Sequence, residues 1–205
     1  MDKELTPSRL PLVEEFYTLQ GEGFHAGKAA YFIRIGGCDI GCSWCDSRFA
    51  WRSDLHPLTD ADVIIDHCVK SGTDSAVITG GEPLMWNLDY LCAGLQMNKI
   101  GTFIETSGAY PISGTWNWIC LSPKKKMPPL EDICMKADEL KVIIQDTDDF
   151  EWAEEYRYKV NENCRLFLQP EWSRFNQITP KIVDYIKNNP AWRISLQIHK
   201  YMHIP

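Results

Sequence analysis

The sequence predicts an α/β fold with a mostly parallel sheet. Short runs of β-branched and aromatic residues, typical of buried strands, recur along the 205 residues. Stretches with a helical spacing of apolar residues lie between several of these runs, and alternation of strand and helix is the pattern of a parallel sheet. Polar, glycine and proline residues follow the strands, at the edge where such folds place their active sites.

The strands are expected at 30–35, 76–79, 102–106, 118–122, 140–144, 165–169 and 193–197. The helices are expected at 59–70, 88–97, 149–159 and 180–187, and the capping pattern Thr59-Asp-Ala-Asp62 opens the first of them. The lysine- and proline-rich stretch at 123–129 is typical of a connecting loop. A chain of this length fits one domain with a substantial core, so residues 1–205 are expected to form a single domain.

Three cysteines follow the first of these strands in the order C-x3-C-x2-C, at Cys38, Cys42 and Cys45. Three thiolates on one short loop can hold three irons of a [4Fe-4S] cluster and leave the fourth iron open to a ligand. The alternative is a zinc site, which would need a fourth ligand such as His25 or His67. The other cysteines are scattered singly through apolar segments and are expected to be free and buried: Cys68, Cys92, Cys120, Cys134 and Cys164.

The charge balance favours a small-molecule substrate. Lys and Arg number 21 against 28 Asp and Glu, which gives a net charge of −7. No overall basic field is present to attract nucleic acid or an anionic membrane, so neither partner is expected. Apolar runs are too short to span a bilayer and no signal-like segment opens the chain, so a cytoplasmic protein is expected.

Four polar segments follow other expected strands, namely Thr79-Gly-Gly-Glu-Pro83, Glu105-Thr-Ser-Gly108, Ser122-Pro-Lys124 and Gln169-Pro-Glu-Trp172. The carboxyl ends of parallel strands share one rim, so these segments and the cysteine loop are expected to meet there. Gly80 and Gly81 lack side chains and so let the backbone approach a bound cofactor. The neighbouring lysines Lys125 and Lys126 are expected to be solvated.

A C-x3-C-x2-C motif after one strand, followed by a Gly-Gly-Glu-Pro segment after the next, resembles the sequence pattern of the radical S-adenosylmethionine superfamily. The chain is similar, more narrowly, to the 7-carboxy-7-deazaguanine synthases. The segments that carry this second resemblance are Leu19-Gln-Gly-Glu-Gly23, Phe32-Ile-Arg34, Cys45-Asp46, the first three segments named above, Gln169-Pro170 and Leu196-Gln-Ile-His-Lys200. The resemblance runs from about Glu14 to the last residue.

The resemblance implies a modified partial (β/α)6 barrel and the conversion of 6-carboxy-5,6,7,8-tetrahydropterin to 7-carboxy-7-deazaguanine with release of ammonia. The product is a precursor of 7-deazapurines such as queuosine. The implied cofactors are a [4Fe-4S] cluster on the three cysteines, S-adenosylmethionine and Mg2+. The implied partners are an electron donor such as flavodoxin or ferredoxin and a second copy of the chain in a homodimer.

The resemblance also assigns site residues, although no side chain is assigned as a catalytic acid or base. Glu82 would accept a hydrogen bond from the methionine amino group, and the expected S-adenosylmethionine contacts are Trp44, Asp46, Gly81, Glu82, Ser122, Pro123, Lys124, Gln169, Pro170, Glu171 and Trp172. Ser47, where the family commonly has threonine, would ligate Mg2+. The expected substrate contacts are Leu19, Gln20, Gly21, Glu22, Arg34, Thr79 and the terminal carboxylate of Pro205.

Within this set, the planar guanidinium of Arg34 suits bidentate pairing with a carboxylate. His199 and Lys200 are either contacts that secure the C-terminal segment or surface residues. Three rival functions remain open from the sequence: a radical activase acting on a protein, a different small-molecule radical enzyme, and a zinc-stapled binding module.

Overall fold

The computed structural model describes residues 8–205, and this part of the chain forms a nine-stranded sheet in the order β3-β1-β2-β4-β5-β6-β7-β8-β9. Every neighbouring pair from β2 to β9 is parallel, whereas β1 is antiparallel to both β2 and β3. The strands are β1 (Arg9–Leu19), β2 (Ala29–Ile35), β3 (Leu58–Asp60), β4 (Ser75–Gly80), β5 (Gly101–Thr106), β6 (Trp118–Leu121), β7 (Glu139–Ile144), β8 (Arg165–Pro170) and β9 (Trp192–Ile194).

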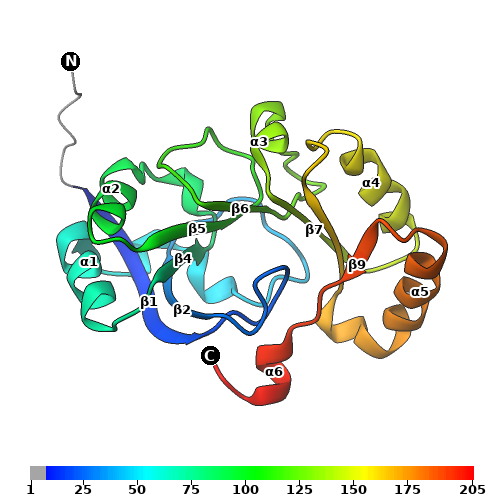
Figure 1. Ribbon diagram of the computed structural model, residues 1–205, viewed down its shortest axis with the longest axis horizontal. Helices are drawn as coiled ribbons and strands as arrows, with labels where there is room; N and C mark the ends of the chain where they lie inside the picture. Colours follow the sequence, from blue (N-terminus) through cyan, green and yellow to red (C-terminus); the bar gives the residue numbers. More distant parts are fainter. Residues whose placement is uncertain (1–7) are drawn as a thin grey trace.

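The α-helices are α1 (Ala61–Lys70), α2 (Asp89–Met97), α3 (Glu131–Lys136), α4 (Asp148–Arg157), α5 (Phe175–Asn188) and α6 (Ile198–Met202). Short 3-10 helices lie in the loops: η1 (Arg48–Ala50), η2 (Ser53–Leu55), η3 (Pro83–Met85) and η4 (Trp172–Arg174). Helices α1 to α5 lie along the outside of the curved sheet, which forms an incomplete barrel (Figure 1). Residues 107–117 join β5 to β6 without a helix.

The hydrophobic core lies between the sheet and these helices. Ile104 of β5 and Leu140 of β7 are fully buried in one cluster with Leu91 of α2, Ile133 of α3 and Ile182 of α5. Burying one such side chain stabilises the fold by roughly 1.5–3 kcal/mol. Residues on β5 alternate between buried and partly exposed. The second face of the sheet is therefore free to carry polar groups into the barrel interior.

The predicted alternation of strands and helices is confirmed, and most strand boundaries differ from the prediction by one residue. The strand expected at 193–197 is wrong beyond Ile194, where β9 ends. The backbone N–H of Ser195 still donates to the Leu168 carbonyl at 2.9 Å, but Gln197 already leads into α6. The side chains of Ser195 and Gln197 make polar contacts with the site rather than continuing a strand.

Most helix boundaries also differ from the prediction, by one or two residues at α2 and α4 and most informatively at the starts of α1 and α5. Thr59 and Asp60 belong to β3, so α1 begins at Ala61, and its N-cap Asp60 makes no side-chain capping bond. Helix α5 begins at Phe175 instead of Pro180, which lies inside the helix. Pro180 is the sixth residue of α5, beyond the first four N–H groups that lack partners in any helix, so it removes one hydrogen bond of the helix.

Strands β1 and β3 and helices α3 and α6 were not expected from the sequence. In β1 the adjacent charges Glu14 and Glu15 and the early Pro11 interrupt the apolar alternation. The strand forms because β2 and β3 supply its backbone partners on both sides. Tertiary pairing thus overrides a weak local pattern.

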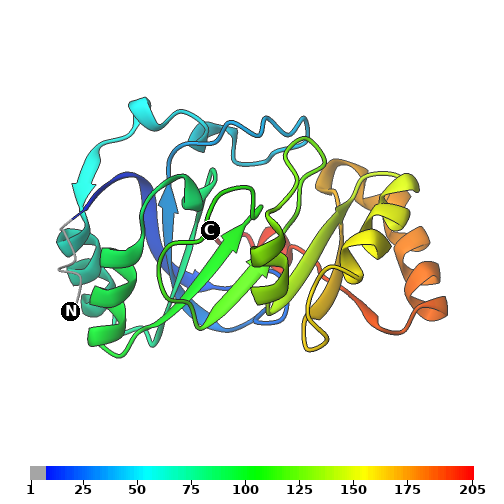
Figure 2. The same cartoon turned by 90° about the horizontal axis from the view of Figure 1, so that it is seen from above.

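The loop that follows β1 reaches the segment that follows β9. The Ile198 N–H donates to the Gly21 carbonyl at 2.9 Å, and the Gly23 N–H donates to the Ser195 hydroxyl at 2.9 Å. This loop therefore bridges the open side of the incomplete barrel. The segment between β2 and β3, light blue in Figure 2, runs over the end of the sheet to which the parallel strands point. Across residues 8–205, every helix is too short or too polar to serve as a bilayer span.

Candidate active site

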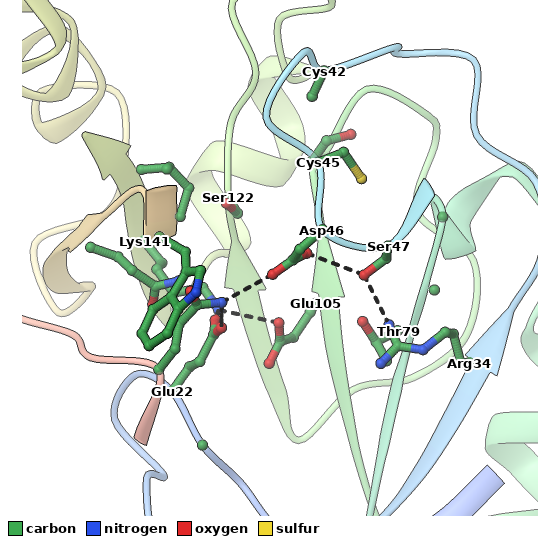
Figure 3. Close-up of a pocket in the computed structure, with 18 of the residues that line it drawn as sticks. Glu22, Arg34, Cys42, Cys45, Asp46, Ser47, Thr79, Glu105, Ser122 and Lys141 are labelled. Carbon is green, nitrogen blue, oxygen red and sulfur yellow. Dashed lines mark hydrogen bonds and ion pairs between the residues drawn. The ribbon is translucent and has the colours of Figure 1, made fainter. Parts of the chain in front are cut away.

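One cavity of about 450 Å³ opens at the carboxyl ends of the parallel strands. Its walls come from the loop after β1, from the segment between β2 and β3, from the ends of β4 to β8 and from the C-terminal segment. The predicted convergence of the strand-end segments on one rim is thus confirmed in the geometry. Figure 3 shows the polar side chains that point into this space.

The three cysteines lie together at one wall of the cavity, half-buried and free. Burial raises the pKa of the Cys38 thiol, and the neighbouring Cys42 and Cys45 thiols add to this effect. The indole N–H of Trp51 points at Cys45 Sγ from 3.3 Å, as a donor to a metal-bound thiolate would. These features fit three thiolate ligands of one cluster.

The arrangement does not resemble a zinc site. Within residues 8–205, no three His, Cys, Asp or Glu side chains converge as ligands of a single ion do. His67 bonds the Glu15 carboxylate at 2.5 Å, and His25 packs at an angle against the rings of Phe103 and Trp118. Neither histidine lines the cavity with the cysteines. A cluster, whose irons spread their thiolates apart, suits this loop better than one ion.

The Gly-Gly-Glu-Pro loop packs directly against the cysteine loop. A Cβ at Gly81 would lie 2.2 Å from the Gly37 carbonyl oxygen and 2.8 Å from Cys38 Cβ. Gly80 has a φ of +147°, and its Cβ would lie 2.0 Å from the Ile35 carbonyl oxygen. Gly81 is therefore required by contact with the cysteine loop and Gly80 by contact with the end of β2, reasons that the sequence did not reveal.

Glu82 is 2% exposed, and its carboxylate joins the ends of β4 and β5. One oxygen accepts hydrogen bonds from the Leu84 N–H at 3.1 Å and the Thr106 hydroxyl at 2.5 Å. The other accepts from the N–H and the hydroxyl of Ser107. A carboxylate offers about four acceptor positions, so a ligand's amino group would replace one of these bonds.

A cationic corner is formed by Arg34, Thr79 and Ser47. Arg34 and Thr79 are register partners on the parallel strands β2 and β4, which places their side chains next to each other (Figure 3). Arg34 Nε donates to Glu14 at 2.7 Å, and its Nη1 lies 3.5 Å from the Ser47 hydroxyl. The Ser47 hydroxyl donates to Asp46 at 3.2 Å. This corner can receive an anion and carries oxygen atoms suited to a hard metal ion.

An acidic corner lies on another side of the cavity, where Lys141 pairs with both Glu22 and Glu105 (Figure 3). Lys141 Nζ lies 3.2 Å from Glu105 Oε2 and also contacts Glu22 Oε2. Burial opposes charge on Lys141, but the two carboxylates outweigh it and raise its pKa well above the usual value. The corner therefore carries one cation and two carboxylates.

The C-terminal segment is attached to the cysteine loop. Lys200 Nζ donates to Asp46 at 3.0 Å and lies 4.7 Å from the centre of the Trp172 ring. Gln197 bridges Asp46 and Glu22 through its amide nitrogen. Pro205 lines the cavity at the end of this segment. Lys200 is thus the contact that secures the segment, one of the two alternatives that the sequence left open.

All the predicted site residues line this cavity except Pro123, which is buried beside it. Trp44 lines the cavity, and Lys124 Nζ lies 5.5 Å from its ring centre. Lys125 and Lys126 are exposed, as expected, although Lys125 pairs with Asp149. The five other cysteines are free and buried, which confirms that prediction.

Sequence reasoning assigned no site role to several polar residues of the cavity, among them Glu105, Lys141 and Gln197, and it left His199 between a structural contact and a surface position. Lys141 could have been found as a charged residue inside the otherwise apolar run 140–144. Glu105 could have been found as the first residue of the segment Glu105-Thr-Ser-Gly108, which the sequence already predicts at the rim. Gln197 and His199 reach the cavity only because the chain turns after β9, and no local sequence pattern predicts that turn.

A parallel partial barrel with a three-cysteine loop at its rim and a polar cavity beneath defines a radical S-adenosylmethionine enzyme with a [4Fe-4S] cluster. A family model described as a 4Fe-4S single cluster domain matches residues 19–108. The chain is 56% identical over 196 residues to a 7-carboxy-7-deazaguanine synthase from Flavobacterium psychrophilum, covering 96% of this chain and 93% of that protein. It is 43% identical over 201 residues to one from Synechocystis, covering 98% and 96%.

The fold is also similar to the crystal structure of QueE from Escherichia coli, with a TM-score of 0.81, 28% sequence identity and 93% of each chain covered. The chain belongs to the 7-carboxy-7-deazaguanine synthase family. The expected fold class and the expectation of a radical S-adenosylmethionine enzyme of 7-deazapurine biosynthesis are thereby confirmed.

Proposed function

We propose that this chain converts 6-carboxy-5,6,7,8-tetrahydropterin to 7-carboxy-7-deazaguanine and releases ammonia. The observation that carries the proposal is the polarity of the cavity, which has the cationic corner of Arg34 on one side and the carboxylates of Glu22 and Glu105 on another. A carboxypterin has matching ends, since a carboxylate lies at one end and the N–H donors of an aminopyrimidinone lie at the other. Complementary ends fix the orientation of a ligand.

When bound, the cluster and S-adenosylmethionine supply a 5′-deoxyadenosyl radical that can remove a hydrogen atom from the substrate. Cys38, Cys42 and Cys45 would hold the cluster. Contacts to S-adenosylmethionine are proposed for Trp44, Asp46, Gly81, Glu82, Ser122, Pro123, Lys124, Gln169, Pro170, Glu171 and Trp172, a role supported by the position of all but Pro123 on the cavity wall.

Arg34 would pair with the substrate carboxylate through the guanidinium nitrogens that Glu14 does not occupy. Ser47 would ligate Mg2+ through its hydroxyl. The backbone of 19–21, with Thr79 and Glu22, would bind the pterin ring. The Pro205 carboxylate would reach the substrate from the C-terminal segment, which the contacts of Lys200 and Gln197 hold at the cavity.

We further propose a single catalytic domain over 1–205, a homodimer, a flavodoxin or ferredoxin as electron donor, and a cytoplasmic location. A hydrophobic cluster that extends from Leu10 of β1 to Trp192 of β9 supports the single domain. The net charge of −7 supports the absence of nucleic-acid and membrane partners.

The reaction is tested by anaerobic reconstitution with iron and sulfide, followed by product analysis with the carboxypterin. We expect a deazaguanine product that depends on S-adenosylmethionine. Cleavage of S-adenosylmethionine without this product would instead indicate a different radical enzyme, and modification of an added protein would indicate an activase. Either result would overturn the proposal.

The orientation of the substrate is tested with Arg34→Gln. Loss of a charge-assisted pair costs about 1.5–3 kcal/mol, so KM for the carboxypterin should rise by about tenfold or more. Glu14→Gln is the matched control, because it removes the Arg34 partner outside the substrate contact and should change KM little. Equal effects of the two substitutions would count against the assigned role of Arg34.

A further inference from the structure

Lys141 is a buried lysine in the middle of β7, and its side chain is 4% exposed. Its ammonium group lies between carboxylates that come from two other parts of the sheet, Glu22 after β1 and Glu105 on β5. Lysine is rarely buried to this extent without partners, because removing the charge from water is costly. The position of Lys141 therefore depends on both carboxylates, and theirs depends on it.

The second oxygen of each carboxylate is held by an amide. Gln197 Nε2 donates to Glu22 Oε1 at 2.8 Å, and Gln20 Nε2 donates to Glu105 Oε1 at 2.9 Å. Both carboxylates are thus fixed at two points while remaining partly open to the cavity, with side chains 14% and 23% exposed. A carboxylate oxygen has two acceptor positions, so a ligand can still donate to each of them.

We infer that Lys141 is a positioning residue that keeps Glu22 and Glu105 together as a pair of ionised acceptors for the donor edge of the substrate. The inference rests on the proposed function for the identity of that substrate. Lys141 lines the cavity, but its side chain is 4% exposed, against 14% for Glu22 and 23% for Glu105, so the two carboxylates meet a ligand first. It acts on recognition through them.

The physical basis is the repulsion between two carboxylates that share a site. Without a cation between them, one carboxylate takes up a proton, and a protonated carboxyl donates a hydrogen bond where the substrate needs an acceptor. The other titratable groups facing this trio are Asp46 of the cysteine loop, Cys120 of β6, Lys124 after β6, Glu139 of β7 and His25 after β1. Asp46, Cys120 and Glu139 cannot replace the positive charge of Lys141, and Lys124 already lies over the Trp44 ring.

The first test uses Lys141→Met protein without cofactors and infrared spectroscopy with labelled glutamate carboxyl groups. We expect a new protonated-carboxyl band near neutral pH that disappears as the pH is raised. The band should appear in the difference spectrum between Lys141→Met and wild type. It should be absent from Lys141→Arg and from Lys141→Met combined with either Glu22→Gln or Glu105→Gln. The double variants also serve as folded controls, because they lack the uncompensated pair of like charges.

The second test measures turnover across pH. In Lys141→Met, KM for the carboxypterin should rise by about tenfold or more near neutral pH and recover toward alkaline pH, while kcat changes less. Lys141→Arg should restore binding in part. If no protonated-carboxyl band forms in Lys141→Met and its KM shows no new pH dependence, the inference is wrong. A band without pterin turnover by wild type would instead overturn the proposed function and leave the pairing role intact.

Discussion

The carboxylate of Glu82 accepts two hydrogen bonds from Ser107, one from its backbone N–H at 2.8 Å and one from its hydroxyl at 2.6 Å. These bonds connect the loop after β4 to the loop after β5 at the rim of the cavity. Because both groups are nearly fully buried, the connection is part of the protein's stability as well as of its site.

Glu82→Gln should therefore destabilise the cofactor-free protein by roughly 2–3 kcal/mol, because an amide N–H₂ would face donors that now lie against a carboxylate. Urea unfolding under anaerobic conditions measures the change. Ser107→Ala, which removes one donor, should cost only about 1 kcal/mol. A glutamine variant as stable as wild type would show that the four bonds contribute nothing net.

Gly81→Ala should disturb the cysteine loop, since the new methyl group would collide with the Gly37 carbonyl at 2.2 Å. We expect a lower iron content per chain after reconstitution and a weaker cluster absorbance. Gly101→Ala is the matched control, because its Cβ would meet only ordinary contacts, the nearest at 3.6 Å. Equal iron content in the two variants would contradict the packing argument.

Glu139→Gln should flatten the dependence of stability on pH. Burial raises the pKa of Glu139, which accepts hydrogen bonds from the Phe24 N–H at 3.1 Å and the Trp118 indole at 3.2 Å. The folded state therefore holds this proton more tightly than the unfolded state does. The resulting stabilisation is present below the unfolded value of about 4.5 and is lost as pH rises through the folded pKa.

The free energy of unfolding of wild type, measured from about pH 4 upward, should thus fall more steeply with pH than that of the Glu139→Gln variant. Glu162→Gln, at an exposed position, controls for the simple loss of one carboxylate. Parallel pH profiles for wild type and Glu139→Gln would refute this assignment.

Lys200→Met should loosen the C-terminal segment locally. Its ammonium group is shared by Asp46 at 3.0 Å and Gln197 Oε1 at 2.9 Å. Because the Asp46 side chain is 56% exposed, the global loss should stay below about 1 kcal/mol. Hydrogen exchange should nevertheless speed up at 198–205. Lys187→Met, which removes an exposed pair with Asp184 on α5, should leave this exchange unchanged.

Ser47→Ala should raise the Mg2+ concentration for half-maximal turnover by about tenfold, or about 1.4 kcal/mol, because it removes the proposed hydroxyl ligand. Ser47→Thr keeps the hydroxyl and should bind the metal at least as well as wild type. A metal titration of turnover distinguishes the variants. An alanine variant with the wild-type requirement would remove Ser47 from the metal site.

The sequence predicted the parallel arrangement because most of the strands and helices carry their own local pattern of apolar residues. It placed the cysteine loop and the strand-end segments at one rim for the same reason. It could not show that Glu82 is held by Ser107 or that Lys141 pairs with Glu22, because these partners are distant in the chain and selected by the fold. Strand β1, too, depends on the strands beside it more than on its own residues.

The bridge between the loop after β1 and the segment after β9 has a consequence for how the protein is made. Gly23 and Ser195 are 172 residues apart, and Glu22 and Gln197 are 175 apart. Contacts of such sequence separation close late in folding, and synthesis proceeds from the N-terminus. A partly synthesised chain therefore has its cysteines long before it has a finished pocket, and the site becomes complete only after Ser195 and Gln197 have been added.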